Sequence, residues 1–216
     1  MLPLFLTLAL DSAMPMPPAG TYRYQAFINN KSVGGSTVTV SPDAPGTKIV
    51  ESSASHLPTG DTRTNSTLLL DASLVPAIYT ASYKVQDDSM LASVSFNGRS
   101  ATVTAGTDQR TFQMGGSSKN FVIIDSGTMS GFLMLPAQMK AWNDADATAL
   151  IPGVGSEAFL SVLRDVPQQR PGTIPAADVS LSLAGEAPFV EWYDPNTLVV
   201  DEVEIPGQNL RITRRR

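Results

Sequence analysis

The chain contains no cysteine and only one histidine, His56, among its 216 residues. Without cysteine it can form no disulfide bond, and it cannot be anchored to a membrane through a lipidated cysteine. With one histidine, neither a Ser-His-Asp set nor a cluster of histidine metal ligands can be proposed from spacing. As the leading interpretation we therefore expect no metal, no cofactor and no catalytic residue.

Basic residues are also few, with 15 Lys and Arg against 20 Asp and Glu, and the net charge of −5 argues against a nucleic-acid partner. The only basic run, Arg214-Arg215-Arg216, is typical of a solvated tail. Acidic residues follow one predicted strand without all sharing a face, which favours a solvated strand. These residues are Asp201, Glu202 and Glu204.

No hydrophobic run is long enough for a transmembrane span. Residues 2–10, LPLFLTLAL, have the length of a signal-peptide core, although no Lys or Arg precedes them. The alternative is a buried first strand. We interpret residues 1–19 as an apolar leader, a signal remnant with a Pro-rich spacer, and residues 20–216 as a single β domain. This interpretation predicts an extracytoplasmic protein, either periplasmic or secreted.

Residues 20–124 and 177–213 are rich in Ser, Thr and Val, and their polarity alternates as it does in β-strands. The dipeptide Asn97-Gly98 lies between two alternating segments. It predicts a two-residue hairpin in which both turn residues have positive φ. The pattern indicates a mainly β protein with an antiparallel sheet.

Residues 129–142 break the alternation, because Phe132, Leu135, Met139 and Trp142 recur at helical spacing. Proline is poorly tolerated inside a helix, so we expect a helical turn at 129–134 and a helix that starts at Pro136. One apolar helical stripe among many strands predicts a strongly curved sheet, a half-barrel, wrapped around a short helical segment.

One motif resembles a known active site. The run Phe121-Val122-Ile123-Ile124-Asp125-Ser126-Gly127-Thr128 is similar to the active-site loop of aspartic proteases, in which two carboxylates share one proton. The chain offers no second copy, so an aspartic-type endopeptidase would need a dimer that pairs the two Asp125 residues. The other interpretation is a strand end whose Asp125 caps the next helical turn, accepting from the N–H of Gly127 or Thr128.

Large apolar and aromatic residues on the predicted inner faces are candidates for a binding groove, although such residues more often form the core. The candidate binding residues are Tyr22, Tyr24, Tyr79, Tyr83, Phe96, Phe132, Leu135, Met139 and Trp142. With the missing catalytic groups, they favour a non-catalytic binding or carrier protein for an apolar or amphipathic ligand, or for an envelope partner. The alternatives are the Asp125 peptidase and a structural or interaction module without a ligand cavity.

The order of elements resembles the extracytoplasmic half-barrel proteins related to the lipoprotein carriers LolA and LolB, and uncharacterised secreted bacterial β-proteins of that type. The resemblance covers most of residues 20–213. The residues that carry it are Gly20-Thr21-Tyr22-Arg23-Tyr24, Leu68-Leu69-Leu70-Asp71, Leu74-Val75-Pro76, Ile124-Asp125 and the run from Phe189 to Pro206. It implies a curved antiparallel sheet packed on a helical plug, with an apolar concave face that suits a lipid-like ligand.

Overall fold

The structure is a computed structural model that describes part of the chain. It covers residues 16–57, 60–114, 120–125, 127–143, 146–163, 171–185 and 188–216, with the backbone alone for 158–163 and 185. The apolar run at residues 2–10 lies outside the described residues.

The described residues form strands, one α-helix and two 3₁₀ turns. The helix α1 is Ser130–Trp142, and the 3₁₀ turns are η1 (Pro152–Val154) and η2 (Pro206–Gln208). The strands are β1 (Gly20–Ile28), β2 (Lys31–Asp43), β3 (Gly46–Leu57), β4 (Gly60–Leu70), β5 (Pro76–Val85), β6 (Asp88–Asn97), β7 (Ser100–Ala105), β8 (Asp108–Gln113), β9 (Phe121–Ile123), β10 (Asp146–Ile151), β11 (Ser156–Leu163), β12 (Val179–Gly185), β13 (Phe189–Tyr193), β14 (Val200–Ile205) and β15 (Leu210–Arg215).

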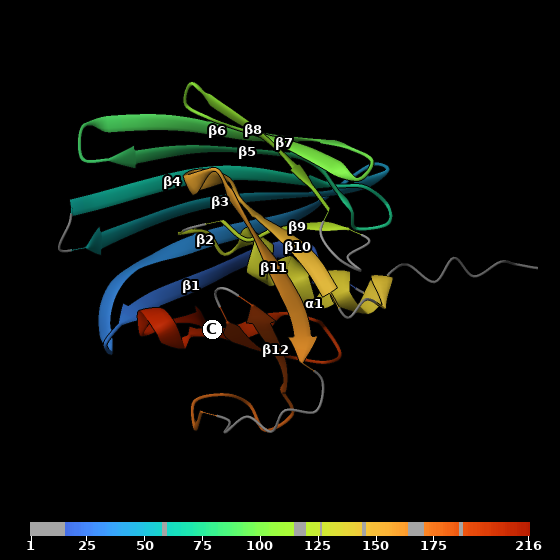
Figure 1. Cartoon of the computed structure of the whole chain (residues 1–216). Helices are drawn as coiled ribbons and strands as arrows, with labels where there is room; N and C mark the ends of the chain where they lie inside the picture. The colour runs from blue at the N-terminus through green and yellow to red at the C-terminus, as the bar shows by residue number, and fades with distance from the viewer. Residues whose placement is uncertain are drawn as a thin grey trace, which may run out of the picture.

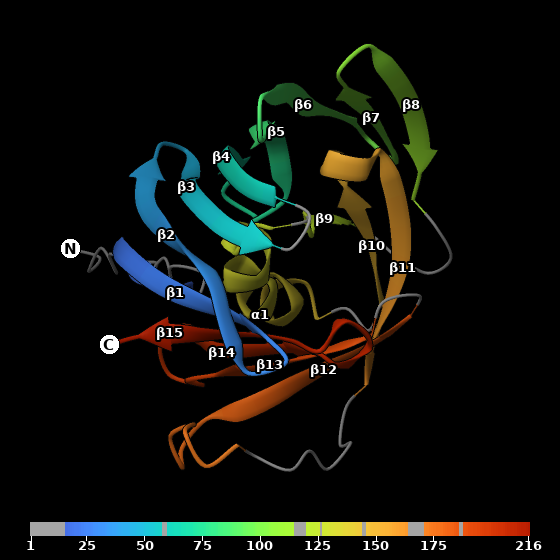
Figure 2. The same ribbon diagram turned by 90° about the vertical axis from the view of Figure 1, so that its left-hand side faces the viewer.

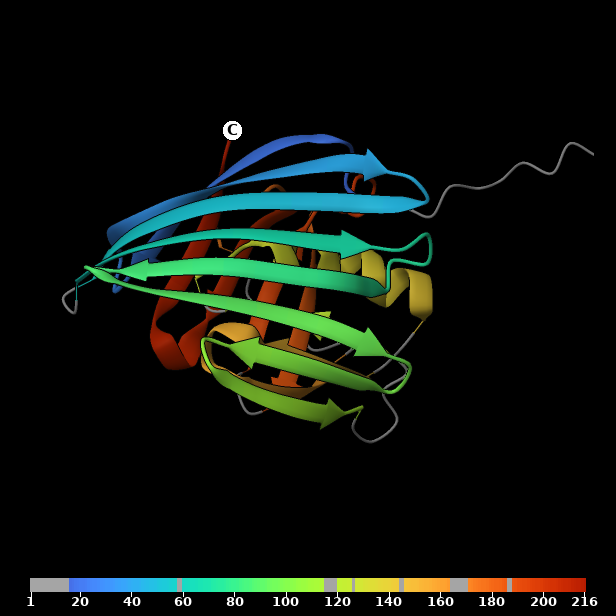
Figure 3. The same cartoon turned by 90° about the horizontal axis from the view of Figure 1, so that it is seen from above.

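All of these strands belong to one sheet, in the order β8-β7-β6-β5-β4-β3-β2-β1-β15-β14-β13-β12-β11-β10-β9. Strands β1 to β8 run up and down side by side (Figure 3). The two ends of the described chain meet where β1 pairs antiparallel with β15. Among the described strands, the pair β9–β10 is the parallel one. Short turns between neighbouring strands produce this regular meander.

The sheet curls around α1, so the prediction of a mainly β half-barrel around a helical segment is confirmed. Figure 2 shows the strands surrounding the helix, and Figure 1 shows β1–β8 on one side of it and β12 on the other. The helix is mainly apolar, and every residue from Ser130 to Met139 is buried. A helix with this composition is stable only when it is enclosed.

Besides the helix, the side chains on the inner face of β2–β7 form a large part of the core. One row of buried side chains lies directly opposite one another across six strands, and the neighbouring row on the outer face is polar except for Val50. This arrangement follows from the two-residue period of a strand. The inner row is Val40, Ile49, Leu68, Tyr79, Val94 and Val103, and the outer row is Thr39, Val50, Thr67, Thr80, Ser93 and Thr104.

The helix corrects one sequence prediction. It is continuous from Ser130 to Trp142, and Pro136 lies inside it rather than at its start. Pro136 removes one donor, because it has no N–H to give to the carbonyl of Phe132. Burial of the helix on all sides stabilises it by more than this single bond, since packing rather than propensity provides most helical stability in proteins.

The β6–β7 hairpin forms as predicted, but its turn is displaced by one residue. Asn97 pairs with Ser100 inside the ladder, so the two loop residues are Gly98 and Arg99. Of the Asn97-Gly98 pair, only Gly98 has a positive φ, at 59°. One glycine at the first loop position is sufficient for a two-residue hairpin of the II′ kind.

Helix α1 approaches β9 so closely that Gly131 should tolerate no side chain. A Cβ at Gly131 would lie 1.7 Å from the carbonyl oxygen of Ile123. We expect Gly131→Ala to lower the free energy of unfolding by about 1–3 kcal/mol, as overpacking does elsewhere, measured by urea denaturation. Gly207→Ala is the control, because a Cβ there has nothing within 4 Å. Equal effects of the two substitutions would contradict this packing.

Candidate functional site

A cavity of about 450 Å³ lies at one end of the half-barrel, beside the N-terminus of α1, and is partly open to solvent. Both halves of the sheet and the helix contribute to its wall, and most of the lining side chains are apolar. The lining residues are Ala26, Ile28, Val33, Gly35, Ser36, Ser53, Ala54, Ser55, Leu57, Ile124, Asp125, Gly127, Thr128, Met129, Phe132, Ala149, Ile151, Val154, Phe189, Ile205, Gln208, Leu210 and Ile212.

Strand register explains why residues distant in sequence meet at this cavity. Ala26 of β1 lies directly opposite Ile212 of β15, so both face the same interior. From the other side of the cavity, Phe132 of α1 meets Phe189 of β13 edge to face, with ring centroids 5.2 Å apart. Edge-to-face pairs are a favoured aromatic geometry and fix the helix against β13.

Glu51 holds the N-terminus of α1 against the sheet. The Met129 N–H donates to both carboxylate oxygens of Glu51, at 2.7 and 2.8 Å, and the Ser130 N–H donates to Oε2 at 2.7 Å. Met129 itself provides no side-chain cap. The carboxylate therefore takes over the capping role that satisfies free N–H groups and complements the helix dipole.

Glu51 is only 1% exposed, and its burial raises its pKa to about 7. The N–H groups of Met129 and Ser130 lower the pKa, because they stabilise the charged form, but desolvation is the larger effect. Sequence reasoning missed this residue. The available signal was the position of Glu51 on its strand. Glu51 is two residues from Ile49, so both lie on the same face of β3, and it pairs with the buried Val38 of β2.

Asp125 forms a junction between three parts of the barrel. Its Oδ2 accepts hydrogen bonds from the hydroxyl groups of Tyr79, at 2.5 Å, and Tyr83, while its Oδ1 accepts the N–H of Gly153 at 2.8 Å. Tyr79 and Tyr83 belong to β5, and Gly153 belongs to η1 in the β10–β11 connection. Burial, and then the negative charge of Asp125, raise the pKa of both tyrosines well above the usual range.

Neither interpretation of the Asp125 motif foresaw these partners of the carboxylate. At the turn that follows, the Asp125 backbone carbonyl accepts the N–H of Thr128, at 3.3 Å. Asp125 is 2% exposed inside the barrel. A shared proton would require the carboxylates of two copies to lie within about 3 Å of each other.

Of the nine predicted binding residues, Phe132 lines the cavity. The others lie elsewhere in the interior or beside it. Tyr22, Tyr24, Leu135 and Met139 belong to the core, Tyr79 and Tyr83 hold Asp125, Phe96 packs against Phe121, and the Trp142 indole donates to the Ser73 carbonyl. Helix α1 occupies the middle of the barrel, and the cavity lies beside its N-terminus. The rest of the lining was not predicted, because it depends on which strand ends meet.

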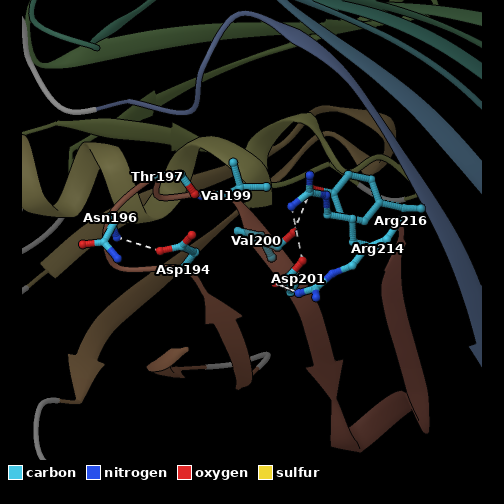
Figure 4. Close-up of polar contacts among 9 residues, drawn as sticks. Asp194, Asn196, Thr197, Val199, Val200, Asp201, Arg214 and Arg216 are labelled. Carbon is cyan, nitrogen blue, oxygen red and sulfur yellow. Dashed lines mark hydrogen bonds and ion pairs between the residues drawn. The ribbon is translucent and has the colours of Figure 1, made fainter. Parts of the chain in front are cut away.

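Asp201 and Glu202 of β14 are buried and Glu204 is half-buried, so these residues do not form the solvated strand face predicted from their pattern. Asp201 is 6% exposed and Glu202 is fully buried. The C-terminal arginines are likewise not a free tail, because β15 extends to Arg215. Arg214 and Arg216 form ion pairs with Asp201, at 3.4 and 2.8 Å (Figure 4). The two arginines supply the positive charge that compensates the buried carboxylate of Asp201.

Glu191 of β13 is a further buried carboxyl group, with an exposed fraction of 0%. It lies opposite the buried Val203 and two residues from Phe189, on the face that packs against α1. Among the described residues, neither of its oxygens has a hydrogen-bond partner. Desolvation alone raises its pKa well above the ordinary value.

The described part of the chain holds no group of three or more His, Asp or Glu placed to bind a metal ion. None of its helices has the length and apolarity needed to cross a membrane.

The fold is similar to that of two solved structures. One is a β-barrel-like protein of the domain of unknown function DUF1849 from Brucella abortus, with a TM-score of 0.57 and 8% identity over 93% of this chain and 96% of that chain. The other is a DUF1089 family protein from Pseudomonas aeruginosa, with a TM-score of 0.49 and 9% identity over 89% of this chain and 92% of that chain. No protein-family model and no curated protein sequence matches. The Brucella structure supports a β-barrel-like fold, without linking the chain to the LolA and LolB carriers specifically.

Proposed function

We propose that this protein is a non-catalytic binding or carrier protein for an apolar or amphipathic molecule. The observation that carries the proposal is the cavity of about 450 Å³ with its mainly apolar lining. Its volume falls within the range of about 300–1,000 Å³ that is usual for small-molecule sites. A cavity of this kind also favours ligand binding over the alternative of an interaction module with a filled interior.

The cavity has the composition that such a ligand needs. Apolar side chains from the helix and from both halves of the sheet face it, including Ile28, Phe132 and Ile212. Transfer of apolar ligand surface from water into this wall is favourable by roughly 25 cal/mol per Å². A few polar groups in the lining, among them Ser36 and Gln208, can orient a polar end of the ligand.

We further propose that the protein acts outside the cytoplasm. The support is the sequence of residues 2–10, whose apolar run has the length of a signal-peptide core. A protein that shields an apolar molecule from water is useful in an aqueous compartment between or outside membranes. Fractionation of the native host, with detection of the protein in periplasm, medium or cytosol, tests the location directly.

Filling the cavity tests the binding function. Ala26 lines the cavity from β1, so Ala26→Phe should weaken binding of the neutral apolar dye N-phenyl-1-naphthylamine at least tenfold, measured by fluorescence titration. The matched control is Ala77→Phe on β5, because Ala77 is exposed and does not line the cavity. Circular dichroism of each variant verifies the fold. Absence of saturable binding to the unmodified protein, or equal binding by the two variants, would overturn the proposal.

A further inference from the structure

One wall of the cavity is held against strand β3 by two side chains. Residues 127–130, here named the capped turn, lead into α1, and the first three of them line the cavity. The Glu51 carboxylate accepts two N–H groups of this turn at 2.7–2.8 Å, and the Ser53 hydroxyl donates to the Gly127 carbonyl at 2.8 Å. The position of this wall therefore depends on the contacts that β3 makes with it.

The protonation state of Glu51 decides how firmly the capped turn is held. An ionised carboxylate offers only acceptors, and here both oxygens accept from N–H groups. Protonation turns one oxygen into a donor, which cannot bond an N–H, and it removes the negative charge that a helix N-terminus favours. Because burial raises the pKa of Glu51 to about 7, both states are populated near neutral pH.

The ionisable groups around Glu51 either stay neutral or are engaged with other partners. Tyr24 of β1 interacts with the Glu51 charge, and burial raises the pKa of Tyr24 well above its usual value, so it is neutral at pH 7. Arg214, which also acts on Tyr24, is paired with Asp201 at 3.4 Å. Asp125, near the start of the capped turn, is held by the tyrosines of β5 and by an N–H of η1. The residues that β2, β4 and α1 place against Glu51 are uncharged, namely Val38, Ser66, Met129 and Ser130.

A ligand in the cavity binds more tightly when the capped turn is fixed. Thr128 and Met129 of this turn and Phe132 of α1 line the cavity, so an apolar ligand packs against them. A wall that is already in its binding position loses less conformational entropy when the ligand arrives. The ionised state of Glu51 therefore favours binding, and the protonated state weakens it.

We propose that the cavity releases its apolar ligand on acidification, because protonation of Glu51 loosens the capped turn. This inference rests on the proposed binding function and adds the regulation of the same site. The coupling is reciprocal, so binding of the ligand drives the proton off Glu51. It requires no charge on the ligand, and a neutral probe tests it.

The affinity of the unmodified protein for N-phenyl-1-naphthylamine, measured by fluorescence titration from pH 5.5 to pH 8.5, tests the coupling, because this dye stays uncharged throughout the range. One group with a pKa of about 7 can change the affinity by at most about tenfold between pH 6 and pH 8. We expect binding to be about three- to tenfold tighter at pH 8, with proton release on binding at pH 7, measured by calorimetry in two buffers. Equal or tighter binding at pH 6 overturns the coupling and leaves the binding function intact. Absence of dye binding at every pH means that the proposed function itself fails.

A matched pair of variants tests whether Glu51 is the group responsible. Glu51→Gln removes the titrating group, so its affinity for the dye should differ less than twofold between pH 6 and pH 8. Burial also raises the pKa of Glu202 to about 7, but Glu202 lies between Trp192 and Thr213 in the sheet, so Glu202→Gln should keep the pH dependence. Circular dichroism verifies the fold of each variant. An unchanged pH dependence in Glu51→Gln, or its loss in both variants, overturns the assignment to Glu51.

Discussion

Replacing Asp125 by Asn should lower the free energy of unfolding by about 2–4 kcal/mol, since hydrogen bonds to charged groups contribute about 1.5–3 kcal/mol each. The substitution preserves the size of the side chain, but it removes the charge and one acceptor oxygen. Asn cannot accept from Tyr79, Tyr83 and the Gly153 N–H together, because its amide nitrogen is a donor. Urea denaturation followed by circular dichroism measures the change.

The control for this prediction is Asp61→Asn. Asp61 is 72% exposed and contacts the exposed His56 at 2.7 Å, so its substitution should change stability by less than about 0.5 kcal/mol. If Asp125→Asn has no larger effect than this control, Asp125 does not connect the barrel as described.

The position of Asp125 explains why its effect should be large. Strand β5 belongs to the half of the sheet formed by β1–β8, and η1 connects β10 and β11 in the half formed by β9–β15. In the sheet order these two halves are joined only through β1 and β15. Asp125 therefore connects two regions that are distant along the hydrogen-bonded sheet. Loss of this junction weakens the barrel next to the cavity wall, where Asp125, Ile124 and Val154 lie.

Strand positions were largely readable from the sequence, because alternation has a strong period and many turns carry their own signals. Strands occupy much of residues 20–124 and 177–213, the two regions in which the alternation predicted them. Errors arose where packing outweighed local preference. Pro136 remains in a continuous helix because the sheet encloses that helix on all sides.

The candidate site was much less readable, because its parts come from strand ends that meet only in the folded barrel. Phe132 was found through its helical spacing, whereas Phe189 and Ile212 gave no signal that they would face the same space. The burial of several acidic residues was also not predicted from the sequence. Glu202 was predicted on a solvated strand face and Glu51 was not singled out, since the sequence does not reveal which face of a strand a distant segment covers.

The same buried acids predict that the protein is more stable at mildly acid pH than at alkaline pH. Burial raises the pKa of Glu51 to about 7 and raises that of Glu191 well above its ordinary value. Both groups bind a proton more tightly in the folded protein than in the unfolded chain. Their contribution to stability is therefore complete below the unfolded pKa of about 4.3, and it is lost as the pH rises through the folded pKa.

From Glu51 alone, we expect the free energy of unfolding to fall by roughly 2–3 kcal/mol between pH 5 and pH 8, at 1.36 kcal/mol per pKa unit. Urea denaturation at half-unit pH steps measures this profile. Glu51→Gln removes one titrating group and should flatten the profile by that amount. Glu157→Gln, at an exposed position on β11, should leave its slope unchanged. Stability that rises between pH 5 and pH 8, or a Glu51→Gln profile as steep as that of the unmodified protein, would contradict the role of Glu51 as a buried acid whose proton is held more tightly by the folded state.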